Sequence, residues 1–140
     1  MKKYKVGYTT GVFDMFHIGH LNILRRAKEQ CERLIVGVST DELVQEYKNK
    51  VPVISFEERK AIVSAIRYVD EVVAQTSMDK LEACKRLGVD AVFHGSDWKG
   101  SQMYDKVTEE LKSIGVDMVF LPHTDGISST ILRGEKGVQE

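Results

Sequence analysis

Two histidines three residues apart, His17 and His20, have the type and spacing that most directly indicate chemistry. They flank Gly19 where a strand-like segment, 5–10, is followed by a segment with helical apolar spacing, 18–31. Residues three apart share one helix face, and the first turn of a helix offers backbone N–H groups and partial positive charge. Imidazole N–H groups there could bind phosphate oxygens and stabilise charge developing at phosphorus or on a leaving pyrophosphate. The pattern therefore indicates a phosphate-binding helix start.

Other residues that could bind a nucleotide or its phosphates lie in three further segments. Lys48 and Lys50 occupy a polar loop that ends in proline, and lysine suits phosphate as a compact charge. Asp97 follows a strand-like segment, where a carboxylate could bind a ribose or magnesium. A second loop-to-helix start near the C-terminus offers hydroxyls and backbone donors for phosphates. Its residues are Gly126, Ile127, Ser128, Ser129 and Thr130.

The elements that must position these residues alternate regularly along the chain. Strand-like segments are expected at 5–10, 34–38, 71–74, 91–93 and 118–121. Three helices are expected at 18–31, 78–87 and 101–114. Two more are expected to begin at capping boxes, one starting at Ser39 and one at Ser55. This alternation predicts an α/β fold, a Rossmann-like doubly wound parallel five-stranded sheet with helices on both faces. Ligands bind such sheets outside the carboxyl ends of the strands, where the loops after the first, fourth and fifth strands all lie.

Composition limits the class of protein. The 140 residues predict a single domain, 1–140, with one core. A net charge of −1 gives no basic field for nucleic acid, so an anionic ligand must be bound by a local cluster of donors. No apolar run approaches the ~20 residues of a membrane span, and the start is unlike a signal peptide, so we expect a cytoplasmic protein with no membrane partner. The cysteines and histidines show no metal-ligand spacing, and no protein-bound metal is expected.

Four segments together resemble a known family. Residues 11–20 read GVFDMFHIGH, which is similar to the GTFD…HxGH signature of the nucleotidyltransferase superfamily. Residues 121–130 read LPHTDGISST and resemble the RTEGIST motif of its cytidylyltransferase branch. Residues 67–72, RYVDEV, and 95–98, GSDW, also resemble that branch, and its small bacterial glycerol-3-phosphate cytidylyltransferases are the most similar group. HxGH alone indicates only the superfamily, which includes adenylyltransferases; the other segments make the resemblance more specific.

The resemblance implies a reaction and its substrates. A phosphorylated alcohol, first glycerol 3-phosphate, would attack the α-phosphorus of CTP, and pyrophosphate would leave with Mg²⁺, giving CDP-glycerol. The family is usually homodimeric and supplies precursors of cell-wall or capsule polymers. The resemblance assigns His17, His20 and Lys50 to catalysis and Lys48, Arg59 and Lys80 to acceptor binding. It assigns nucleotide contacts to Thr10, Gly11, Val12, Phe13, His17, Gly19, His20, Arg67, Asp97, His123, Thr124, Gly126, Ile127, Ser128, Ser129 and Thr130.

Three departures from the family pattern leave alternatives open. His123 stands where the family has an arginine, whose bidentate fork histidine cannot reproduce. Ser96 replaces an aspartate, and Met78 replaces a tryptophan of the acceptor region, where Lys80 is the displaced candidate lysine. The alternatives are a cytidylyltransferase for another polyol phosphate, choline phosphate or a phosphonate, an ATP-dependent adenylyltransferase on a sugar phosphate or flavin precursor, and a nucleotide-binding module without turnover.

Overall fold

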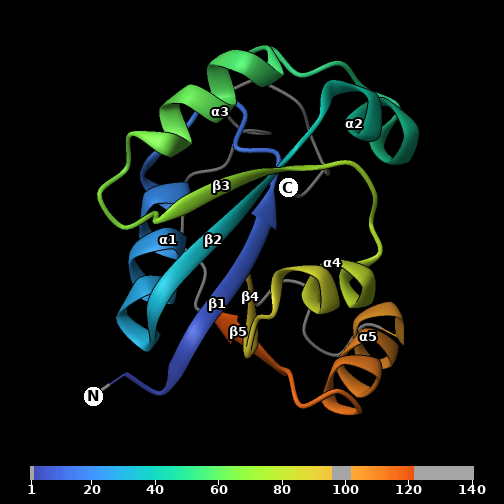
Figure 1. Ribbon diagram of the computed structural model, residues 1–140. Helices are drawn as coiled ribbons and strands as arrows, with labels where there is room; N and C mark the ends of the chain where they lie inside the picture. Colours follow the sequence, from blue (N-terminus) through green and yellow to red (C-terminus); the bar gives the residue numbers. More distant parts are fainter. Residues whose placement is uncertain (1, 96–101, 122–140) are drawn as a thin grey trace.

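The computed structural model describes residues 2–95 and 102–121, which form five strands and five helices (Figure 1). In chain order the elements are β1 (Tyr4–Gly11), α1 (Ile18–Gln30), β2 (Cys31–Ser39), α2 (Asp41–Lys48), α3 (Phe56–Ser64), β3 (Glu71–Gln75), α4 (Lys80–Leu87), β4 (Ala91–Gly95), α5 (Gln102–Lys112) and β5 (Asp117–Leu121). None of the helices in these two ranges has the length and apolar character needed to cross a bilayer.

The strands form one parallel sheet in the order β3-β2-β1-β4-β5. The chain therefore winds outward from β1 in one direction and then, after β3, returns to the other side of β1. This doubly wound order confirms the predicted α/β fold. The point where the direction changes lies between β1 and β4, and ligands of such sheets bind at that switch point, outside the carboxyl ends of the strands.

Helices cover both faces of the sheet, because the side chains of each strand alternate between two cores. In β2, Leu34 and Val36 belong to the core under α1 and α3, whereas Ile35 belongs to the core under α4 and α5. Leu24 of α1 and Leu111 of α5 are fully buried in these respective layers. Figure 1 shows α4 and α5 together on one side of the sheet and α1 on the other.

Local capping explains where the structure differs from the sequence prediction. The second helix is capped by Thr40 and not by Ser39, because Ser39 is still the last residue of β2 and its hydroxyl donates to Gln75. The helix expected from residue 78 begins at Lys80, with Asp79 as the N-cap. The cap predicted at Ser55 is confirmed.

Two large apolar side chains near helix C-termini are partly exposed, Ile62 at 43% and Ile114 at 38%. Gly88 and Gly115 end the helices before β4 and β5 with φ of 67° and 79°, as their positions in the sequence predicted.

Candidate active site

The first turn of α1 is capped by the two histidines themselves. Nδ1 of His17, the N-cap residue, accepts a hydrogen bond from the backbone N–H of Gly19 at 3.0 Å. In return, Nδ1 of His20 accepts one from the backbone N–H of His17 at 3.2 Å. This is a capping box in which imidazoles replace the usual serine and glutamate. The i, i+3 spacing that suggested a shared face therefore also serves helix initiation.

The capping box determines which ring nitrogen of each histidine carries a proton. A nitrogen that accepts a hydrogen bond from an N–H group is unprotonated, so both Nδ1 atoms are acceptors and the ring proton lies on Nε2. The two rings stack with centroids 3.9 Å apart and an interplanar angle of 21°. Two Nε2–H donors thus belong to parallel rings at one helix start, an arrangement suited to adjacent oxygens of a phosphate chain.

The loop between β1 and α1 contains unusual backbone conformations. Phe13 and Met15 have φ of 55° and 50°, a left-handed region that costs a bulky residue about 1–3 kcal/mol each. Phe13 is buried, and its ring contacts His20 edge-to-face at a centroid distance of 5.4 Å; Phe16 contacts the same imidazole at 5.3 Å. The strained loop therefore holds aromatic rings against His20 and limits its movement.

Gly11 makes room for this arrangement in a way that the sequence did not indicate. It is the last residue of β1, directly before the loop. A Cβ atom at Gly11 would lie 3.1 Å from the ring of Phe13, which is tighter than most packed contacts. The glycine therefore accommodates the Phe13 ring, and the turn itself is made by Phe13 and Met15.

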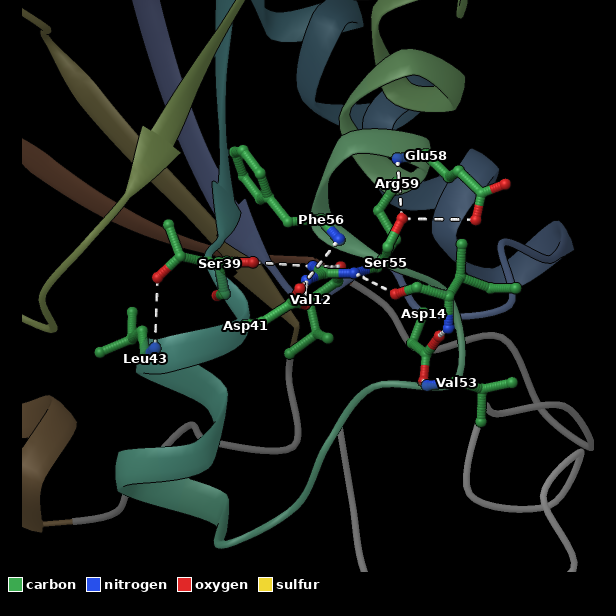
Figure 2. A network of polar contacts seen from close by, with 12 residues as sticks. Val12, Asp14, Ser39, Asp41, Leu43, Val53, Ser55, Phe56, Glu58 and Arg59 are labelled. Carbon is green, nitrogen blue, oxygen red and sulfur yellow. Dashed lines mark hydrogen bonds and ion pairs between the residues drawn. The ribbon is translucent and has the colours of Figure 1, made fainter.

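Asp14 attaches a second loop to the histidine loop. Its side chain is fully buried, and its two carboxylate oxygens accept from the backbone N–H groups of Val53 and Ile54, each at 2.8 Å. Figure 2 shows these bonds reaching from the β1–α1 loop to the segment before α3. Residues 49–55, which follow Lys48 and include Lys50, are therefore fixed at their C-terminal end to the loop that leads to His17.

Arg59 occupies the centre of the same network (Figure 2). Its guanidinium donates to the carbonyls of Val12 at 2.8 Å, Ser39 at 2.7 Å and Ile54 at 2.9 Å, and to Oδ1 of Asp41 at 2.6 Å. The side chain is 1% exposed. The resemblance assigns Arg59 to acceptor binding, and this role stays a prediction; in the structure the buried guanidinium joins the ends of β1 and β2 to α3 through these four bonds.

Lys48 and Lys50 were both predicted to lie in a polar loop; Lys50 does, whereas Lys48 belongs to a helix. Lys48 is the last residue of α2, and Asn49 ends that helix in the left-handed conformation with φ of 53°. Lys48 Nζ lies 5.7 Å from the ring centroid of Tyr47. Both lysines are half-buried. They follow the carboxyl end of β2, the edge of the sheet that also bears the histidines.

Lys80 lies at the same edge beside Thr10. Its Nζ donates to the Thr10 hydroxyl at 3.1 Å, although the residue is only 5% exposed. Burial lowers the pKa of the Lys80 ammonium from its ordinary value to about 8. The structure thus brings a lysine predicted to bind the acceptor into contact with a threonine predicted to bind the nucleotide.

Arg67 is not brought to the histidines within one chain. It lies in the turn between α3 and β3, exposed, next to Asp70. Asp70 accepts from the backbone N–H of Leu34 at 2.7 Å, which places this turn at the amino-terminal edge of the sheet. Within one chain, Arg67 and the histidines therefore lie at opposite edges of the sheet, and the nucleotide contact of Arg67 stays a prediction.

Several predicted site residues lie outside the described residues. The predicted residues outside the described ranges are Asp97, His123, Thr124, Gly126, Ile127, Ser128, Ser129 and Thr130.

The sequence analysis missed His94 and Tyr104, which contact each other at this edge. The hydroxyl of Tyr104, in α5, lies 2.9 Å from Nε2 of His94, the penultimate residue of β4. A polar residue directly after the apolar run Ala91–Phe93 was the available signal, since it marks the carboxyl end of a buried strand. Tyr104 carried no such signal, because its contact depends on how α5 packs.

The comparison with known families decides the class of this site. The family model described as cytidylyltransferase-like matches residues 8–135, which include the second half of β1 and every later element to β5. The chain belongs to the cytidylyltransferase-like family. His17 and His20, which cap α1, lie within the matched residues.

Two curated members of the cytidylyltransferase-like family are similar along most of the chain. The glycerol-3-phosphate cytidylyltransferase of Bacillus subtilis (strain 168) is 37% identical over 128 residues, covering 91% of this chain and 93% of that protein. The FAD synthase of Pyrococcus abyssi is 41% identical over 118 residues, covering 81% and 77%. Among solved structures, a lipopolysaccharide core biosynthesis protein from Thermoplasma volcanium superposes with a TM-score of 0.71 at 22% identity, covering 86% of this chain and 97% of that one, which supports the fold.

Proposed function

We propose that this protein transfers CMP from CTP to a small phosphorylated alcohol, with glycerol 3-phosphate as the first candidate, and releases pyrophosphate. The observation that carries the proposal is the capping box of His17 and His20, which gives two Nε2–H donors on stacked rings at the ligand-binding edge of the sheet. The relative named for glycerol 3-phosphate, which is matched over almost its whole length, supports this acceptor.

The reaction in this proposal is a direct displacement at phosphorus. A phosphate oxygen of the acceptor attacks the α-phosphorus of CTP, the bond to the bridging oxygen of the β-phosphate breaks, and pyrophosphate leaves with the bonding electrons. The acceptor oxygen is already ionised near neutral pH, so the transfer requires no general base. Catalysis then depends on positioning and on stabilising the charge that builds up on phosphate oxygens.

His17 and His20 would donate from Nε2 to those oxygens. Because their Nδ1 atoms are bound to backbone N–H groups, the rings are fixed before substrate arrives and need no reorganisation during the reaction. Lys50 and Lys48 would add positive charge on the other side of the phosphates. The hydrogen bonds that Asp14 accepts from the backbone N–H groups of Val53 and Ile54 hold the loop of residues 49–55 against the β1–α1 loop. The lysine and histidine donors would therefore keep a constant separation.

Magnesium would enter as part of the substrate, the Mg–CTP complex. Among residues 2–95 and 102–121, no three side chains of His, Cys, Asp or Glu gather as a metal cage. Mg²⁺ retains several water ligands in proteins and is commonly bound through substrate phosphates. Mg²⁺ would neutralise the departing pyrophosphate, while the protein donors act on the phosphate that is transferred.

A second candidate is adenylyl transfer from ATP, because the FAD synthase of Pyrococcus abyssi is 41% identical to this chain. The chemistry at phosphorus is the same in both cases, and the histidine capping box serves either nucleotide. The two candidates differ in the base and in the acceptor, so they are distinguished by substrate and not by mechanism.

The experiment offers the full chain CTP or ATP with Mg²⁺ and a panel of phosphorylated acceptors, and measures pyrophosphate release. The panel contains glycerol 3-phosphate, choline phosphate, ethanolamine phosphate and FMN. The proposal predicts release with CTP and glycerol 3-phosphate. Release with ATP and FMN but not with CTP would instead establish the adenylyl candidate, and CTP binding without release from any pair would establish a module without turnover.

We also propose a cytoplasmic homodimer, as the resemblance to the family implies. Ile62, 43% exposed on α3, and β3, the edge strand among the described residues, give an apolar side chain and a sheet edge that a second copy could cover. Sedimentation velocity across a range of protein concentrations tests the assembly; a single species of 15.8 kDa at every concentration would contradict it.

A further inference from the structure

Asp41 joins the starts of two helices on either side of the loop lysines. It is the first residue of α2, and Oδ2 of its carboxylate accepts from the backbone N–H of Phe56, the first residue of α3, at 3.3 Å. Oδ1 accepts from Nη2 of Arg59, one turn further into α3, at 2.6 Å (Figure 2). Lys48 and Lys50 lie in the chain between these helix starts. One carboxylate therefore closes the base of the segment that carries both lysines.

The carboxylate of Asp41 does not serve as the cap of its own helix. The Thr40 hydroxyl accepts from the backbone N–H of Leu43 at 3.2 Å and caps α2. At the start of α3, the cap residue Ser55 accepts from an N–H later in the first turn, which leaves the first N–H, that of Phe56, for Asp41. The contacts of Asp41 therefore join one element to another.

The position of Lys48 depends on how the first turn of α2 is held. Leu43 and Val44 are buried, whereas residues 45–47, between them and Lys48, are exposed. With eight residues, α2 is about 12 Å long, and a change of about 10° in its direction would move its far end by about 2 Å. A displacement of about 1 Å in a positioned group can cost about 100-fold in rate. A small change at Asp41 is therefore expected to have a large effect at Lys48.

An aspartate suits both partners of this contact. A carboxylate only accepts hydrogen bonds, and the backbone N–H of Phe56 and the guanidinium of Arg59 only donate them. The negative charge of Asp41 also lies at the partially positive N-terminal ends of two helices. The Arg59 guanidinium lies 5.9 Å from the ring centroid of Phe56, so the three side chains form one group. An asparagine would place its NH₂ group against one of the two donors.

We propose that Asp41 is a positioning residue for the transfer reaction, and that it acts through Lys48 by fixing the direction of α2 relative to α3. The inference rests on the proposed function, in which Lys48 places positive charge beside the phosphates. It adds to the contact of Asp14, which holds residues 53 and 54 to the β1–α1 loop. The segment of residues 42–55 is then attached at its base by Asp41 and near its C-terminal end by Asp14, and Lys48 lies between the two attachments.

The test is a double-mutant cycle in the full chain, with the wild type, Asp41→Ala, Lys48→Met and the double variant. Asp90→Ala is the matched control, because Asp90 also accepts a backbone N–H from another element, that of Val6 at 3.0 Å, but at the amino-terminal edge of the sheet. Initial rates of pyrophosphate release give kcat and KM for CTP and glycerol 3-phosphate. Hydrogen exchange with mass spectrometry measures the protection of residues 42–56, and thermal unfolding measures Tm.

We expect Asp41→Ala to lower kcat by about 10-fold or more in the wild-type background, but by about 2-fold or less in the Lys48→Met background. The reason is that a positioning residue loses its effect once the group that it positions is removed. Exchange should become faster in residues 42–56 of Asp41→Ala. Asp90→Ala should leave kcat and this exchange unchanged.

Asp41→Asn keeps the shape of the side chain and one acceptor. It should show a smaller loss of kcat than Asp41→Ala, with the same dependence on Lys48. If Asp41→Ala unfolds below the assay temperature, Asp41→Asn carries the same cycle.

An equal loss of kcat in both backgrounds would overturn the proposal, because Asp41 would then act independently of Lys48. An unchanged kcat in the Asp41 variants would overturn it too. Absence of turnover by the wild type with every nucleotide and acceptor would refute the proposed function, and the exchange measurement would then decide on Asp41 separately. Faster exchange of residues 42–56 in the Asp41 variants, but not in Asp90→Ala, would support the attachment, and unchanged exchange would overturn it.

Discussion

Nδ1 of His20 accepts a hydrogen bond from the backbone N–H of His17, 3.2 Å away, and the two imidazole rings stack with centroids 3.9 Å apart. One geometric relationship thus has two consequences. It satisfies a backbone donor at the start of α1, and it leaves Nε2 as the protonated nitrogen of His20; the bond that Nδ1 of His17 accepts from the backbone N–H of Gly19 does the same for His17. Helix initiation and the proposed catalytic chemistry therefore depend on the same atoms.

The two roles of His17 separate in a pair of substitutions. His17→Asn retains a side-chain oxygen that can cap the helix but loses the Nε2–H donor. We expect it to lower kcat by about 100-fold or more, equivalent to about 3 kcal/mol of transition-state stabilisation, with little change in Tm. Steady-state kinetics and thermal unfolding measure both quantities.

His17→Ala is the comparison, because it removes the donor and the cap together. It should match His17→Asn in kcat and also lose about 1 kcal/mol of stability, which lowers Tm by roughly 4 °C. Near wild-type kcat in His17→Asn would contradict a catalytic Nε2–H at this position.

Asp14→Asn should weaken the attachment of the loop of residues 49–55, which contains Lys50, to the β1–α1 loop. Both oxygens of the buried Asp14 carboxylate accept backbone N–H groups, and an amide can replace only one of them, since its NH₂ group would face an N–H donor. Charged hydrogen bonds of this kind contribute about 1.5–3 kcal/mol each. We expect kcat to fall by about 10-fold or more and the amides of Val53 and Ile54 to exchange faster with deuterium, as mass spectrometry or NMR can measure. The exposed Asp105→Asn is the control, and unchanged exchange at residues 53 and 54 would contradict the prediction.

Arg59→Lys should destabilise the fold. A lysine retains the charge but cannot bond at once to the three carbonyls and the carboxylate that Arg59 joins. Leaving these buried acceptors unpaired should cost about 3 kcal/mol and lower Tm by roughly 10 °C. Arg86→Lys, at an exposed arginine of α4 that pairs with Glu82, should leave Tm almost unchanged. A normal Tm with a raised acceptor KM in Arg59→Lys would indicate the substrate contact that the family resemblance first implied.

Lys80→Met should stabilise the protein at neutral pH. The folded-state pKa of about 8 lies below the ordinary value of 10.5, so folding opposes protonation of Lys80. Below pH 8 this opposition costs the folded state about 3 kcal/mol, and because the unfolded chain binds more protons between pH 8 and 10.5, the cost declines as pH rises through that window. Removing the ammonium should remove the cost.

Urea unfolding at pH 7 and pH 9.5 measures this effect. The wild type should gain about 2 kcal/mol relative to Lys80→Met between the two pH values, and comparing the proteins cancels the contributions of other titrating groups. Parallel pH dependence in the two proteins would show that Lys80 titrates normally.

Periodicity and caps predicted the fold well because they are local. The five parallel strands, the Ser55 cap and the helix ends at Gly88 and Gly115 all follow from residues close in sequence. Ser39 and Thr40 compete for one cap, and the choice depends on the bond of Ser39 to Gln75 on β3, a tertiary contact. Local pattern could not predict that choice.

The site divides in the same way. His17 and His20 could be found because their three-residue spacing puts them on one helix face and because imidazoles can donate hydrogen bonds to phosphate oxygens. The burial of Arg59 could not be predicted, because its acceptors come from the β1–α1 loop, β2, α2 and the loop before α3, up to 47 residues away. The pairing of Lys80 with Thr10 spans 70 residues and depends on the position of α4 beside β1.

The transfer of label from α-³²P-CTP to glycerol 3-phosphate tests the central claim most directly. With Mg²⁺, the wild-type chain should form labelled CDP-glycerol and release one pyrophosphate for each product molecule, and His17→Asn should form it about 100-fold more slowly. Labelled ATP should transfer no AMP to the same acceptor. No labelled product from CTP, or faster transfer from ATP, would contradict the account.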